Sequence, residues 1–138
     1  MSQLLLANAA AQLLVASLLG WWMLIPMQPW GGRLRGLVSR SALLAAHLDW
    51  ILLALTQGLA AYVHQTHPLE REALLTGALI AGGWLNAVPY LFRGVGVDAF
   101  VFAGPLRQRL ATTLSGLSAL ALTLAWADIA QQLVRQVG

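Results

Sequence analysis

Four apolar stretches, each long enough to cross a bilayer as a helix, constrain this chain more than any other feature of its sequence. A hydrocarbon core of about 30 Å needs ~20 consecutive apolar residues in an α-helix. The stretches use most of the 138 residues, so no room remains for a separate soluble domain. The sequence therefore predicts an all-α, integral membrane four-helix bundle, with a single domain over residues 1–138. Its spans are expected at residues 4–25, 41–63, 73–92 and 110–134.

The overall composition supports insertion into a lipid bilayer. Hydrophobic residues make up 59% of the chain and charged residues 9%, whereas soluble domains carry about 25% charged residues. Strands of alternating polarity are absent from the sequence, so helices are favoured over a barrel. The first stretch lacks a basic leading segment and is too long for the core of a signal peptide, which predicts a retained span. Cysteine is absent, which excludes disulfides and thiolate ligation of haem or iron–sulfur clusters.

Arginine supplies every cationic side chain, and most of the eight arginines lie in the first and third connections between the stretches. These two connections share one side of a four-span protein. The excess of positive charge in cytoplasmic loops therefore predicts that both are cytoplasmic and that both termini lie outside. No basic patch interleaved with aromatic residues is present, so nucleic acid is not an expected partner.

Two features of the second half of the chain leave alternatives open. Residues 94–105 are apolar and aromatic but too short to span, which fits an interfacial or re-entrant lid or a connector lying on the headgroups. The third and fourth stretches are rich in small residues, which allow helices to approach closely. Such residues serve packing within one chain or an interface between copies. They are Gly77, Ala81, Gly82, Gly83, Ser115, Gly116, Ser118 and Ala119.

The second stretch holds two ionisable side chains, His47 and Asp49. A charged side chain at the centre of a membrane helix costs ~2.5–3.5 kcal/mol on insertion scales, and such residues usually mark functional sites. At about 100° per residue, the two side chains lie ~200° apart and cannot share one face of the helix. Asp49 should therefore pair with another helix or subunit, for example through Arg93, or be protonated and bond a backbone carbonyl.

His47 shares one face of its predicted helix with two small residues, Ala54 and Gly58. Small residues along this stripe leave room beside the imidazole. A flat cofactor would need such room, and so would tight packing of two helices. The sequence therefore makes His47 a candidate metal ligand or proton carrier, with Ala54 and Gly58 as candidate cofactor contacts.

The third stretch places Gly82, Asn86 and Tyr90 on one helical face. An amide and a phenol on one face could orient an oxygen-bearing substrate, or they could join helices and anchor the span at the interface. Pro89 removes a backbone donor and predicts a kink at this point. We expect Asn86 and Tyr90, rather than Asp49, to be the partners of His47 across the bundle.

The second connection holds His64, His67 and Glu70, three residues of metal-ligand type. Pro68 interrupts the helix that would align them. We therefore do not expect a zinc site there.

His47 early in the second stretch, combined with Trp84, Asn86 and Tyr90 in the pattern WxNxxxY, resembles the styrene oxide isomerase family. Hydroxylaminobenzene mutase is similar to that group. The resemblance implies a homotrimer of four-helix subunits, multi-pass in the bacterial inner membrane, with haem b bound at subunit interfaces. It implies that His47 is the axial ligand of the iron and that Tyr90 and Asn86 position the oxygen of a small aromatic substrate.

The activity implied by this resemblance is a Lewis-acid, Meinwald-type rearrangement of an aryl epoxide such as styrene oxide to the aldehyde. One position departs from the family pattern, because Leu53 stands where the isomerases carry an asparagine. The run His47-Leu48-Asp49 instead resembles the mutase-like members, so an arylhydroxylamine mutase is the sibling alternative.

Two non-enzymatic functions also fit four spans. Small multidrug transporters carry an essential carboxylate in the first span, and here residues 4–25 hold no charge. A haem electron-transfer subunit usually needs two axial ligands, and only His47 lies deep in a span. Both functions are therefore less favoured than the isomerase.

Overall fold

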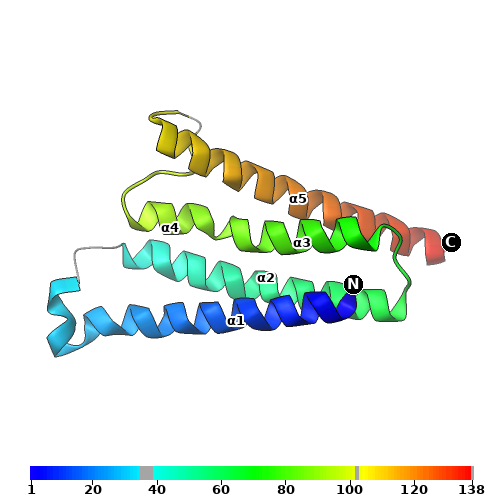
Figure 1. Ribbon diagram of the computed structural model, residues 1–138, viewed down its shortest axis with the longest axis horizontal. Helices are drawn as coiled ribbons and strands as arrows, with labels where there is room; N and C mark the ends of the chain where they lie inside the picture. The colour runs from blue at the N-terminus through cyan, green and yellow to red at the C-terminus, as the bar shows by residue number, and fades with distance from the viewer. Residues whose placement is uncertain (35–38, 102, 138) are drawn as a thin grey trace.

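The computed structural model describes residues 1–34, 39–101 and 103–137, and in these residues the fold is entirely helical. Helix α1 covers Ser2–Leu24 and is followed by two short 3-10 turns, η1 (Ile25–Met27) and η2 (Pro29–Leu34). The other helices are α2 (Arg40–Thr66), α3 (Glu72–Asn86), α4 (Val88–Gly94) and α5 (Leu106–Val137). Successive spans run antiparallel, as Figure 1 shows.

Four helical segments are long and apolar enough to cross a membrane. This confirms the predicted all-α four-helix bundle, and the protein is a multi-pass membrane protein. Each span extends slightly beyond the range predicted from the sequence, because the polar ends of the helices continue past the apolar stretches. The observed spans are Ser2–Met27, Arg40–Thr66, Glu72–Gly94 and Leu106–Gln136.

Helix α2 and the third span (α3 and α4) form the middle of the bundle, between α1 and α5 (Figure 1). Helix α2 packs along α1 on one side and against α3 and α4 on another, and α5 packs on α3 and α4. Many leucines point outward from these helices, among them Leu14, Leu52 and Leu124. Such outward leucines suit a surface covered by lipid tails.

The third span is interrupted at the predicted proline. Helix α3 ends at Asn86 and α4 begins at Val88, so Pro89 lies in the first turn of α4 and is fully buried. Proline lacks a backbone N–H and its ring clashes with the carbonyl four residues earlier, here that of Leu85. The expected kink in the third span is confirmed.

Small residues in the third and fourth spans divide into two groups. Gly82 and Gly83 are buried, and the Ser118 hydroxyl of α5 donates to the Gly82 carbonyl at 2.8 Å. A side chain at Gly82 would collide with Leu122, so these residues serve close packing within one chain. Gly77 and Ala81 are exposed, and a Cβ at Gly77 would meet nothing within 4 Å.

The contrast between two glycines of α3 gives a test of this packing. A Gly83→Ala methyl group would press on Gln57 and lie 3.0 Å from Nε2 of Gln12. We expect it to lower the free energy of unfolding by about 1–3 kcal/mol, the usual cost of overpacking. The control, Gly77→Ala, should not destabilise the protein. Thermal unfolding in detergent measures both, and equal stability of the two variants would contradict the packing described here.

Candidate functional site

His47 lies on the face of α2 that meets α1. Its Nδ1 is 2.7 Å from the carbonyl oxygen of Ala16. A carbonyl can only accept a hydrogen bond, so Nδ1 carries the proton, and in this tautomer of the neutral ring Nε2 has a lone pair. Nε2 has no hydrogen-bond partner in the part of the chain that the structure describes. The ring is therefore held in one orientation, with a single nitrogen available to a ligand.

Gly20 of α1 provides the space that the imidazole occupies. A Cβ at Gly20 would lie only 3.0 Å from Cε1 of His47, so a larger residue would displace the ring. Gly20 also lines a groove of about 370 Å³ between α1 and α2. His47 itself is half-buried and stands beside this groove.

The stripe predicted for a cofactor is only partly open. Ala54 is 1% exposed and packs in the interior, so its side chain does not reach the surface. Gly58 is half-exposed, and a Cβ there would meet nothing within 4 Å. Of the two predicted cofactor contacts, Gly58 therefore lies beside open space and Ala54 does not.

Asp49 lies on the opposite side of α2 and faces α3. Both of its carboxyl oxygens accept hydrogen bonds from Nδ2 of Asn86, at 3.0 and 2.9 Å. The Asn86 carbonyl oxygen in turn accepts a bond from Ser118 at 3.3 Å. One chain of hydrogen bonds thus joins α2, α3 and α5 inside the bundle.

This chain corrects two expectations. Asn86, expected to be a partner of His47, instead bonds Asp49, because the Asp49 side of α2 is the side that packs on α3. Arg93 is not the partner of Asp49, since its guanidinium lies 5.8 Å from the ring centre of Phe100. The separation of His47 and Asp49 onto different faces is confirmed, and the partner of Asp49 is on another helix as expected.

Tyr90 lies under the loop that follows α4. Its ring centre is 5.1 Å from that of Phe100 in a tilted arrangement. The loop is tied to α5 by Thr112, whose hydroxyl donates to the Val101 carbonyl at 3.0 Å. The Tyr90 hydroxyl makes no hydrogen bond to any described residue. The loop therefore covers the ring of Tyr90 and leaves its phenolic oxygen unengaged.

A buried cluster of amides was not identified from the sequence. Gln12 and Gln57 are 0% and 1% exposed, and Nε2 of Gln57 donates to Oε1 of Gln12 at 2.9 Å. Asn8 donates to Gln57 at 2.5 Å and accepts from Nε1 of Trp84 at 2.9 Å. Three uncharged amides inside apolar stretches are the signal that could have indicated this cluster. It joins α1, α2 and α3 beside Gly83.

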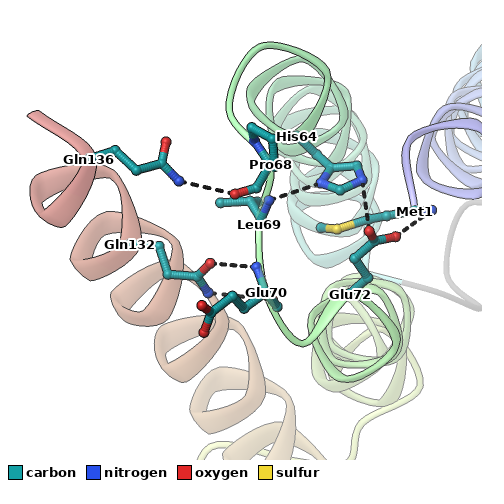
Figure 2. Close-up of polar contacts among 8 residues, drawn as sticks. All are labelled: Met1, His64, Pro68, Leu69, Glu70, Glu72, Gln132 and Gln136. Atoms are coloured by element: carbon teal, nitrogen blue, oxygen red, sulfur yellow. Dashed lines mark hydrogen bonds and ion pairs between the residues drawn. The ribbon is translucent and has the colours of Figure 1, made fainter.

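Residues of the second connection stabilise the loop between α2 and α3 through polar contacts. His64 accepts a bond from the backbone N–H of Leu69 at 3.4 Å and lies 3.4 Å from Glu72 (Figure 2). Glu70 is held through its backbone by Gln132 of α5, at 2.7 Å. Figure 2 shows these bonds gathered where the loop crosses between α2, α3 and α5. Within the described ranges, no three His, Cys, Asp or Glu side chains form a metal-binding group.

A haem differs from such a group because it needs only one ligand from the protein. His47 has the chemistry of that ligand, because its Nδ1–H is held by a backbone carbonyl, as is usual for metal-bound histidines. Its surroundings are helical and apolar, with a groove beside the ring. The residues present therefore fit a haem bound through Nε2.

Comparison of this chain with protein-family models, with curated proteins and with solved structures found no match.

The hydrogen-bonded pair of Asp49 and Asn86 gives a second test. Asn86→Leu leaves the carboxyl group without a donor and should lower stability by about 1–3 kcal/mol. The double variant Asp49→Leu/Asn86→Leu removes both partners. Its loss of stability should be smaller than the sum of the losses in the two single variants. Unfolding measurements on the full cycle give the coupling, expected at ~0.5–3 kcal/mol. Strict additivity would contradict the contact.

Proposed function

We propose that this protein is a membrane-embedded, haem b-dependent isomerase that rearranges an aryl epoxide such as styrene oxide to the aldehyde. The main support is the state of His47, whose Nδ1 bonds the Ala16 carbonyl at 2.7 Å and leaves Nε2 unengaged. The second support is the resemblance of His47 and the WxNxxxY pattern to the styrene oxide isomerase family.

His47 has the properties that this reaction requires of an iron ligand. Haem held by the His47 imidazole would supply an electrophilic iron that activates an epoxide oxygen, whereas a thiolate ligand would donate electron density to the iron. The Ala16 carbonyl fixes the ring, and Gly20 leaves space for it. The outward leucines of α1 and α2 keep water away, and water would otherwise open the epoxide to a diol.

Positioning of the substrate falls to Tyr90 more than to Asn86. The Asn86 amide is already engaged by Asp49 and Ser118, whereas the Tyr90 hydroxyl is unengaged among described residues. His47 faces α1, and Tyr90 lies on α4, which packs on α2 and α5. In the homotrimer that the family resemblance implies, the haem would lie between copies, so a neighbouring copy would complete the site.

An arylhydroxylamine mutase is a second candidate, supported by Asp49. A carboxyl group inside a span can accept hydrogen bonds from the N–H and O–H of a hydroxylamine, and an epoxide has no such donor. Asp49 is half-buried and receives its bonds from a single amide nitrogen, so it retains accepting capacity.

The cofactor assignment predicts a specific loss on mutation. Purified protein supplied with haem should show a Soret band, and His47→Ala should abolish both the band and the isomerase activity. The matched control is His64→Ala, which removes the other half-buried histidine of α2 and should leave the band unchanged. A wild-type protein that stays colourless after haem supplementation would contradict the proposal.

The two substrates can be separated by assaying styrene oxide and phenylhydroxylamine side by side on the haem-loaded protein. We expect turnover of styrene oxide to phenylacetaldehyde, with Asp49→Asn changing that rate less than tenfold. Turnover of phenylhydroxylamine alone, abolished by Asp49→Asn, would instead establish the mutase.

A further inference from the structure

The lining of the groove beside His47 includes one positively charged side chain, that of Arg40. The lining residues are Gly20, Met23, Leu24, Arg40, Ser41 and Leu44. Gly20 is the lining residue in contact with His47, and Arg40 and Ser41 are the first two residues of α2. The groove therefore has a largely apolar lining with a single positive charge at the start of α2.

Arg40, Leu44 and His47 lie on one face of α2, because spacings of four and three residues return to the same side of a helix. The rise over the seven residues from Arg40 to His47 is about 10.5 Å at 1.5 Å per residue. A haem whose iron is held at His47 extends its propionate carboxylates over a distance of this order. An arginine side chain is long and flexible enough to reach them.

No hydrogen bond or ion pair joins Arg40 to the described residues. Arg107 and Arg135 are likewise without such a contact there, but Arg40 lines the groove beside His47. The first turn of α2 adds backbone N–H groups and the positive end of the helix dipole beside it. Together these groups suit an anion at the boundary between lipid and water.

We propose that Arg40 binds a propionate carboxylate of the haem held by His47, with the groove between α1 and α2 covering the edge of the macrocycle. This rests on the proposed function. Arginine binds carboxylates through two parallel N–H donors, which would fix the rotation of the macrocycle about its axial ligand. The headgroup phosphate of an anionic lipid has similar chemistry, and the experiment separates the two.

The test is a titration of the purified apoprotein in lipid-free detergent, followed by absorbance. Haemin is compared with its dimethyl ester, in which both carboxylates are masked. The variants are Arg40→Gln, Arg40→Lys and the control Arg107→Gln, which removes another exposed arginine at the start of a span. Circular dichroism verifies that each variant is folded.

Arg40→Gln should weaken haemin binding about tenfold or more, the effect of losing one charge-assisted pair. Binding of the dimethyl ester should be the same in wild type and Arg40→Gln. Arg40→Lys should restore part of the affinity, and Arg107→Gln should bind both forms as wild type does. Differential loss of haemin over its ester is a result that general destabilisation cannot produce.

Equal haemin affinity in wild type and Arg40→Gln would overturn the assignment of Arg40 and leave the haem proposal standing. An equal loss of affinity for haemin and for its ester would also overturn the assignment of Arg40, since Arg40 would then act without the carboxylates. Unchanged haemin binding with less co-purified phosphatidylglycerol in Arg40→Gln would assign the site to a lipid headgroup instead. A wild type that binds no haemin contradicts both the proposed function and this inference.

Discussion

A polar group inside a bilayer has no water to bond and must find its partner in the protein, and this requirement organises the whole bundle. Asn8, Gln12, Gln57 and Trp84 bond one another across α1, α2 and α3. Asp49, Asn86 and Ser118 do the same across α2, α3 and α5. Apolar contacts between helices contribute little free energy of association in lipid, because lipid tails are equally apolar. These two hydrogen-bonded chains therefore specify which helices are neighbours.

His47 meets this requirement for a hydrogen-bond partner at only one of its two ring nitrogens. Its Nδ1 bonds Ala16, while Nε2 has no partner among the described residues. Two buried atoms lack partners there, Nε2 of Gln12 and Nε1 of Trp50. Both of those are donors, and a donor cannot coordinate a metal. His47 is different because its unengaged nitrogen, Nε2, can offer a lone pair beside a groove. For this reason the proposed function centres on His47.

The hydropathy of the chain was enough to predict the four spans, and Pro89 was enough to predict the break in the third. Helical periodicity also separated His47 from Asp49 correctly. It could not tell which neighbour each face would meet, because the phase within α2 contains no information on the order in which α1 and α3 pack around it. For that reason Asn86 was paired with the wrong residue. The amides Gln12 and Gln57 were missed because single amides leave each apolar stretch long enough to span and carry no charge that would mark them as a site.

The most direct test of this account is the tautomer of His47 in the membrane-embedded protein. The chain has three histidines, so a variant with His64→Ala and His67→Ala keeps His47 alone. Nitrogen-15 NMR of that imidazole distinguishes a protonated ring nitrogen from one with a lone pair. The account predicts a protonated Nδ1 and an unprotonated Nε2, with the Nε2 signal lost on addition of ferric haem. A proton on Nε2 and a lone pair on Nδ1, unaffected by haem, would contradict it.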